Sequence, residues 1–186
     1  MKKIAVIFPG IGYTCDKPLL YYAGKIAAAN GYDIKQVNYG GFSSGIKGNR
    51  KKMEEAFYSA LTQAEEILKD INWEEYDEIL FISKSVGTIV AACYMKKHKI
   101  TGRSISFTPL EDTFLFAQGE GIMFHGTADP WAQNSAEIRE GCEKIGQKLY
   151  LIEGANHSLE TGDVIRDIEN LKNVMGIVKS WNNHTI

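Results

Sequence analysis

Short apolar runs alternate along the chain with longer segments in which apolar residues recur every three or four positions. The short runs predict β-strands, and the longer segments predict helices with one apolar face. Strands that alternate with helices in this way are typical of a parallel sheet covered by helices on both faces. Six strands are expected, at residues 4–8, 34–39, 78–83, 104–107, 121–124 and 148–152.

Capping signals mark the helices between these strands. The first helix is expected to begin with Asp16 as its N-cap and Pro18 in its first turn, and to end at Asn30-Gly31. The other helices are expected at about 51–69, directly after Ser85, at about 134–146 and at about 163–181.

Right-handed crossovers would place the six strands in the spatial order 2-1-3-4-5-6. The result is a three-layer α/β/α sandwich with a mainly parallel sheet, expected as one domain over residues 1–186. Sheets of this kind bind ligands beyond the carboxyl ends of their strands. Functional residues are therefore expected in the loops that leave those ends.

Charge and hydropathy restrict the partners. The chain has 21 basic and 23 acidic residues and a formal net charge of −2, so it has no broad field that would attract nucleic acid or an anionic membrane. The first apolar run stops at Pro9-Gly10 and is too short for the core of a signal peptide, and no run approaches the roughly 20 residues of a membrane-spanning helix. We expect a cytoplasmic protein with neither nucleic acid nor membrane as partner.

Cofactor and metal signals are weak. Cys15, Cys93 and Cys142 are an odd set without pairing or metal-type spacing, which is typical of a reducing compartment. Residues 10–15 lack the third glycine of G-x-G-x-x-G, and Ile46 stands where a phosphate loop needs lysine. Because the histidines are also scattered, neither a cofactor nor a metal is expected.

Candidate chemistry begins where the third expected strand ends, in Ser83-Lys84-Ser85-Val86-Gly87. This strand-to-helix turn matches the nucleophile elbow G-x-S-x-G, with Ser83 in place of the first glycine. A serine held in such a strained turn requires small residues two positions before and two after it. Its hydroxyl would stand at a helix N-terminus, where the dipole favours negative charge. We therefore interpret Ser85 as a candidate nucleophile.

Two partners for this serine follow later strands. The segment His125-Gly126-Thr127-Ala128-Asp129-Pro130 follows the fifth strand, and Gly154-Ala155-Asn156-His157 follows the sixth. A serine hydroxyl needs an imidazole to accept its proton, and the imidazole needs a carboxylate to orient it. We expect His157 to be the base and Asp129 the acid. The alternative acids are Glu111 and Asp112, which follow the fourth strand.

With these motifs the chain resembles a small, lidless serine hydrolase of the α/β-hydrolase superfamily, similar to esterases and dienelactone hydrolases, over nearly its whole length. The resemblance implies cleavage of an ester, thioester or related acyl bond of a small molecule through an acyl-enzyme. It also implies an oxyanion hole built from the amide of Val86 and an amide of the loop after the first strand. Alignment favours Ile11 for the second amide, with Gly10 and Gly12 as alternatives.

Two departures from the superfamily concern access to the site. The antiparallel strands that usually open the fold are absent, and residues 108–118 are too few for a cap domain, so an open site is expected. Candidate walls of the substrate pocket, each equally plausible as ordinary packing, are Tyr13, Phe42, Leu110, Phe114 and Trp131. The alternative function is a catalytically silent binding or scaffolding module of the same fold, which would have no need of three such groups in register.

Overall fold

Six strands form one sheet in which every neighbouring pair is parallel. The computed structural model describes residues 1–46, 48–132 and 134–183. The spatial order is β2-β1-β3-β4-β5-β6, which confirms the predicted order. The strands are β1 (Lys3–Phe8), β2 (Asp33–Gln36), β3 (Glu78–Lys84), β4 (Arg103–Phe107), β5 (Gly121–Gly126) and β6 (Lys148–Ile152).

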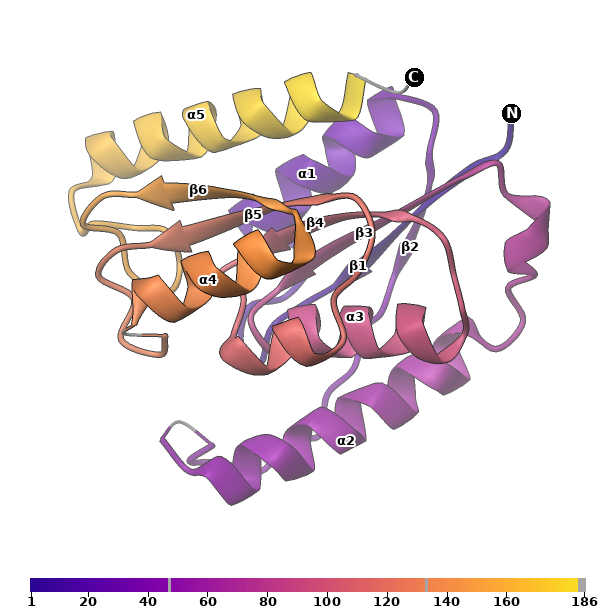
Figure 1. Ribbon diagram of the computed structural model, residues 1–186, viewed down its shortest axis with the longest axis horizontal. Coiled ribbons are helices and arrows are strands. Elements are labelled where there is room, and N and C mark those ends of the chain that lie inside the picture. Colours follow the sequence, from indigo (N-terminus) through magenta and orange to yellow (C-terminus); the bar gives the residue numbers. More distant parts are fainter. Residues whose placement is uncertain (47, 133, 184–186) are drawn as a thin grey trace.

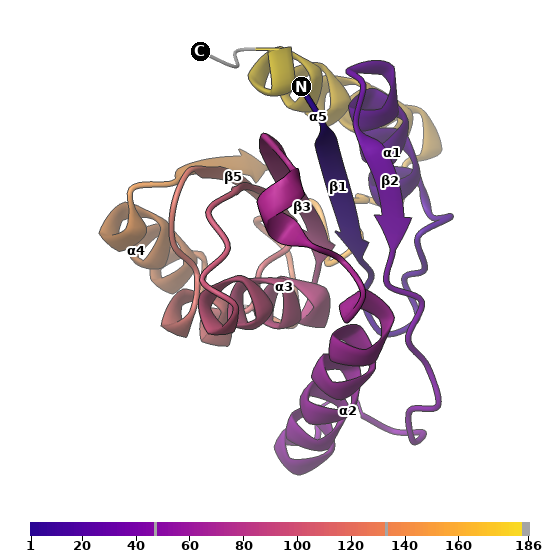
Figure 2. The same cartoon turned by 90° about the vertical axis from the view of Figure 1, so that its right-hand side faces the viewer.

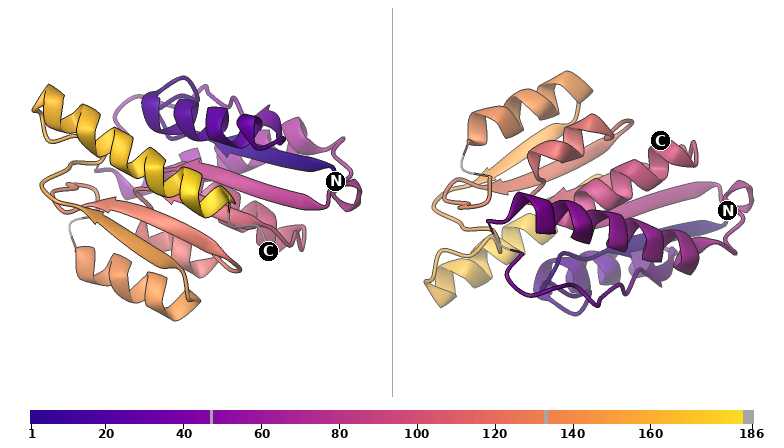
Figure 3. Two further views of the ribbon diagram at one scale, coloured as in Figure 1. Left: turned by 90° about the horizontal axis from the view of Figure 1, so that it is seen from above. Right: turned by 90° about the horizontal axis from the view of Figure 1, so that it is seen from below.

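Helices cover both faces of the sheet, as the sequence pattern predicts. On one face lie α1 (Pro18–Ala29) and α5 (Val164–Asn183), and on the other lie α2 (Arg50–Leu68), α3 (Val86–Lys97) and α4 (Ser135–Ile145) (Figure 1). The edge-on view in Figure 2 separates the two helical layers, and Figure 3 shows each layer from outside. Two short 3-10 helices, η1 (Trp73–Glu75) and η2 (Glu111–Leu115), complete the described elements.

The central strand β3 is buried on both faces. Leu80 and Ile82 pack in the cluster under α1 and α5, whereas Ile79 and Phe81 pack in the cluster under α2 and α3. A parallel strand covered on both faces reads as a continuous apolar run, which is why residues 79–82 show no alternation. Because successive side chains of a strand point to opposite faces of the sheet, Lys84 lies on the same face as Leu80 and Ile82, under α1 and α5.

Several element ends differ from the sequence prediction, and three of these differences have a cause that the structure shows. The strand β2 ends at Gln36 rather than Tyr39, because the amide of Val37 makes the last bond to β1 and the chain then leaves the sheet edge. The strand β5 continues to Gly126, where it still pairs with β6. The prediction of Asp16 as a helix N-cap is wrong: the proline, which fits the first helical position, starts α1, so Lys17 takes the cap position.

No helix within the described ranges has both the length and the apolar content needed to cross a membrane.

Candidate active site

Ser85 occupies a strained turn between β3 and α3. Its backbone has φ 55° and ψ −126°, a conformation that costs free energy for a residue with a side chain. The turn is held by a bond from the Ser85 amide to the carbonyl of Phe107 (3.0 Å) and by one from the Thr88 hydroxyl to the carbonyl of Ser85 (2.6 Å). A Cβ on Gly87 would collide with the carbonyl oxygens of Phe8 and Pro9, so this position requires glycine. The expected elbow geometry is therefore present.

The three residues predicted as nucleophile, base and acid lie in one hydrogen-bonded chain. Ser85 Oγ is 2.7 Å from His157 Nε2, and His157 Nδ1 is 2.7 Å from Asp129 Oδ2. They come from the loops that follow β3, β6 and β5, so the parallel sheet brings them to one edge. The alternative acids, Glu111 and Asp112, are exposed on η2. The carboxylate that bonds the imidazole is that of Asp129.

Asp129 is buried and fully engaged. Its Oδ1 accepts a bond from the amide of Trp131 (2.9 Å), while Oδ2 accepts from His157. Burial raises the pKa of Asp129, but the bond and charge of His157 and the bond from the Trp131 amide outweigh burial, so the pKa lies below its ordinary value. An ionised carboxylate keeps the proton of the imidazole on Nδ1, which leaves Nε2 to accept from Ser85.

The loop after β1 forms a tight turn beside the serine. The amide of Gly10 donates to the carbonyl of Tyr13 (3.1 Å), and the amide of Tyr13 donates to the carbonyl of Gly10 (3.3 Å). Because the amide of Gly10 is engaged, Ile11 and Gly12 remain as candidate oxyanion donors from this loop. Val86 is the first residue of α3, so its amide is one that the helix leaves without an intrahelical acceptor.

A cleft of about 270 Å³ opens directly at the serine. Its lining includes Ser85, His157 and Ile11, and also Ile46 and Met53. Ile46 precedes α2 in the chain, and Met53 belongs to α2. Residues from outside the loops at the strand ends therefore also line the cleft.

A second space of about 530 Å³, which we call the groove, adjoins the cleft. Met53, Val86, Leu110 and Trp131 line both spaces. Beyond them the groove runs between α2 and η2 over largely apolar side chains, with charged residues among its lining. The groove is lined further by Arg50, Glu54, Phe57, Tyr58, Ile89, Glu111, Asp112, Leu115 and Phe116.

Two of the five candidate pocket residues, Leu110 and Trp131, line the cleft. The indole of Trp131 also stacks on the imidazole of His157, with ring centroids 5.2 Å apart. The other three lie elsewhere, because each is used in packing between elements. Tyr13 accepts a bond from the amide of Leu19, Phe42 packs edge-on against Tyr39, and Phe114 packs against Gly141 of α4.

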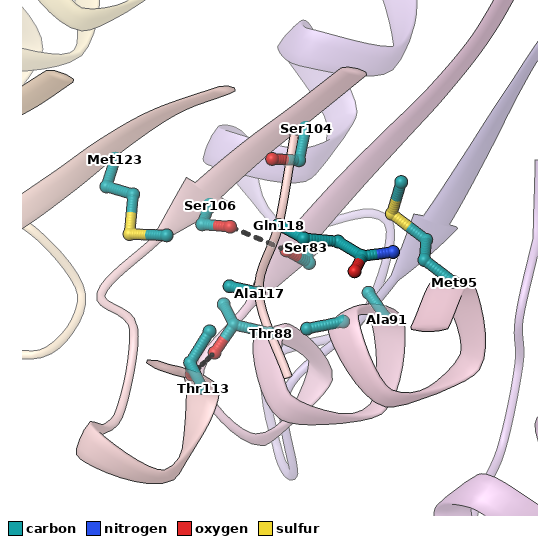
Figure 4. Close-up of a pocket in the computed structure, with 11 residues that line it drawn as sticks. Ser83, Thr88, Ala91, Met95, Ser104, Ser106, Thr113, Ala117, Gln118 and Met123 are labelled. Carbon is teal, nitrogen blue, oxygen red and sulfur yellow. Dashed lines mark hydrogen bonds between the residues drawn. The ribbon is translucent and has the colours of Figure 1, made fainter. Parts of the chain in front are cut away.

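A smaller cavity lies between α3 and the sheet (Figure 4). The hydroxyls of Ser83 and Ser106 are 3.3 Å apart, and those of Thr88 and Thr113 are 2.7 Å apart. The threonine pair ties η2 to the start of α3, and this tie places the residues of η2 beside the elbow. Ser85 does not line this cavity, which is separate from the cleft.

Sequence reasoning missed Lys84, which is buried and bonds to His157 and Thr108. The predicted third strand ends at residue 83, and its residues 79–82 are apolar without alternation. No pattern in the sequence therefore assigns Lys84 to a buried face of the sheet. Among the described residues, no group of three or more His, Cys, Asp or Glu side chains is arranged to hold a metal ion.

No protein-family model matches the chain, and no curated protein matches it. Solved structures do match. An α/β serine hydrolase homologue from Coxiella burnetii has a TM-score of 0.69 and 15% identity, over 99% of this chain and 85% of that one. Est1E from Butyrivibrio proteoclasticus, solved with ferulic acid bound, has a TM-score of 0.69 and 13% identity, over 96% and 87%.

A third match comes from Xanthomonas campestris and is described as an α/β serine hydrolase without a lid. Its TM-score is 0.62 and its identity 12%, over 96% of this chain and 81% of that one. At such identities the likeness shows the fold. The chain has the α/β-hydrolase fold, in a form without a cap domain.

Proposed function

We propose that this protein is a serine hydrolase that cleaves an ester, thioester or related acyl bond through an acyl-enzyme. The observation that carries the proposal is the continuous chain of two 2.7 Å contacts from Ser85 through His157 to Asp129. A nucleophile bonded to a base, with the base oriented by a third group, is the arrangement that activates a serine hydroxyl. The α/β-hydrolase fold of the chain supports the same conclusion.

The reaction follows from these contacts. Ser85 Oγ attacks the acyl carbon, and its proton passes to His157 Nε2. The amides of Val86 and Ile11 then stabilise the negative charge on the acyl oxygen. As the bond to the leaving group breaks, His157 returns the proton to that group. Water next attacks the acyl-enzyme with His157 as base, and the acid leaves as Ser85 regains its proton.

The cleft and the groove support a preference for substrates with an apolar part. Met53, Leu110 and Trp131 line both the cleft at Ser85 and the groove, and we take these shared residues as an apolar path from the serine into the groove. Apolar surface buried along this path would contribute about 0.8 kcal/mol for each methylene group removed from water. We therefore propose an acyl chain longer than acetyl, or an aromatic acyl group, as the part that the groove binds.

The proposed setting is the cytoplasm, with a small-molecule substrate and without nucleic acid. Cys15 and Cys142 are buried thiols and Cys93 is partly buried, and all three are free. Free thiols are typical of a reducing compartment and support this assignment.

Hydrolysis of p-nitrophenyl esters of graded acyl length tests the proposal. The parent protein is expected to turn over at least one ester of the series, and Ser85→Ala is expected to lose that turnover while keeping the circular dichroism spectrum of the parent. If the variant hydrolyses the ester as fast as the parent, the proposal is wrong. A parent that binds these esters without cleaving them favours the silent binding module.

A further inference from the structure

A buried cation lies among the loops of the active site. Lys84 is the last residue of β3, directly precedes Ser85, and is only 1% exposed. Its side chain lies on the face of β3 where Leu80 and Ile82 pack under α1 and α5. Burying an ammonium group in such a place costs free energy unless hydrogen bonds compensate for the lost water. The hydrogen bonds that compensate for the burial of Lys84 therefore indicate its role.

The amine of Lys84 joins loops that follow different strands. Lys84 Nζ donates to the backbone oxygen of His157 (2.6 Å), after β6, and to the hydroxyl of Thr108 (2.6 Å), after β4. It also lies 4.9 Å from the ring centre of Tyr13, after β1. Thr108 is itself fixed, since its amide donates to the carbonyl of Phe124 (2.7 Å). One side chain thus connects the serine elbow with the loop that carries the base.

We propose that Lys84 is a positioning residue for His157, which holds the backbone of that histidine against the elbow so that Nε2 stays within hydrogen-bond distance of Ser85 Oγ. The inference rests on the proposed roles of Ser85 and His157. Asp129 fixes the ring of His157, and Lys84 fixes its main chain. Because Lys84 bonds the carbonyl of the histidine, it acts on the reaction through His157.

The hydrogen bonds of Lys84 persist whether its amine is charged or neutral. Burial lowers the pKa of Lys84 to about 7, although the negative charges of Asp129 and Glu160 oppose that shift. Both acceptors, the carbonyl of His157 and the hydroxyl of Thr108, are neutral oxygens. A neutral amine keeps two N–H groups for two such acceptors, so the positioning holds on both sides of neutral pH.

Lys84→Met tests the inference, because methionine fills the apolar position and cannot donate a hydrogen bond. We expect kcat for p-nitrophenyl acetate to fall about ten- to a hundredfold, since displacing a catalytic group by about an ångström has an effect of this size. KM is expected to stay within about twofold of the parent, because Lys84 is not among the residues that line the cleft or the groove. The control is Leu80→Met on the same face of β3, which should keep kcat within about twofold.

A spectroscopic measurement separates positioning from a general loss of packing. In the parent labelled with ¹⁵N-histidine, the Nδ1 proton of His157 that bonds to Asp129 is expected to give a far-downfield signal. In Lys84→Met that signal should broaden or move, and in Leu80→Met it should not. If Lys84→Met fails to fold, Thr108→Val is the substitute test of the inference. This variant removes one of the two hydrogen-bond acceptors of Lys84, and it should lower kcat at unchanged KM.

The outcomes distinguish this inference from the function on which it rests. If Lys84→Met keeps the kcat and the histidine spectrum of the parent, the inference is overturned while the esterase proposal stands. If Lys84→Met does not fold and the kcat of Thr108→Val equals that of the parent, the inference is overturned as well. If the parent cleaves no ester and a fluorophosphonate leaves Ser85 unlabelled, the proposed function fails and the inference fails with it.

Discussion

The two sides of Ser85 are built differently. On the side that we propose to be catalytic, which holds His157, Asp129 and Lys84, the main chain and imidazole of the histidine, the carboxylate and the amine are tied by hydrogen bonds of 2.6 to 2.9 Å. On the groove side, between α2 and η2, the walls are largely apolar, and Tyr58 and Leu115 are more than half exposed. Hydrogen bonds therefore fix the position of a few atoms on the catalytic side. On the groove side, single residues can be substituted without breaking such bonds.

Removing the base should have the largest effect on the catalytic side. In His157→Ala the serine hydroxyl loses its proton acceptor, and turnover of p-nitrophenyl acetate is expected to fall by about three orders of magnitude or more. Steady-state kinetics of the purified variant measures the loss, and circular dichroism checks that the fold is retained. Near-parental turnover in a folded variant would remove His157 from the mechanism.

The protonation of Lys84 predicts a pH dependence of stability. Its pKa is about 7 in the folded protein and 10.5 in its ordinary environment, so between these values the unfolded chain binds more protons. Folding stability from this group therefore rises from pH 7 to pH 10.5, by an amount on the order of 4 kcal/mol.

Urea unfolding of the parent and of Lys84→Met at pH 6, 8 and 10 measures this effect. The free energy of unfolding of the parent should rise relative to that of the variant as the pH increases. Parallel pH profiles would mean that the lysine keeps an ordinary pKa, and the protonation argument would then be wrong.

The elbow shared by the two sides depends on Gly87. Gly87→Ala puts a methyl group against the backbone oxygens of Phe8 and Pro9, and should lower the free energy of unfolding by about 2 kcal/mol. Gly176→Ala is the matched control, because this exposed glycine of α5 has no atom near its added Cβ. The control should stabilise the helix by about 0.5 to 1 kcal/mol. Equal effects at both positions would contradict the close approach at the elbow.

The smallest effect is expected on the groove side. Met53→Ser removes part of the apolar path, and should lower kcat/KM for p-nitrophenyl octanoate by about five- to tenfold while that for the acetate changes by less than about twofold. Steady-state kinetics on the two esters measures the difference. Equal losses on both esters would show that the acyl chain does not follow the groove.

The catalytic side could be predicted from the sequence because its residues follow strand ends. Parallel pairing of β3, β5 and β6 fixes where those ends lie, and each candidate stands directly in the loop beyond one of them. The burial of Lys84 could not be predicted, because the predicted strand ends at residue 83 and shows no alternation that would assign the lysine to a face. The contacts among Ser85, His157 and Asp129 are present as predicted, whereas the catalytic roles of these residues and of the Val86 and Ile11 amides stay predictions.

The groove side could not be predicted in the same way. Nothing in the pattern of residues 43–46 indicates that Ser43, Gly45 and Ile46 line the cleft at Ser85 together with Met53 of α2. Aromatic residues near strand ends can serve either a pocket or the packing of a neighbouring element, and only the tertiary contacts decide. Trp131 stacks on His157 at the site, whereas Phe114 fills the space beside Gly141 of α4.

The most direct test of the central claim is the mass of the protein after treatment with a fluorophosphonate, followed by identification of the modified peptide. We predict one adduct for each molecule, located on Ser85, and none in Ser85→Ala under the same conditions. An unmodified parent, or an adduct that persists in the variant, would contradict the assignment of Ser85 as the nucleophile.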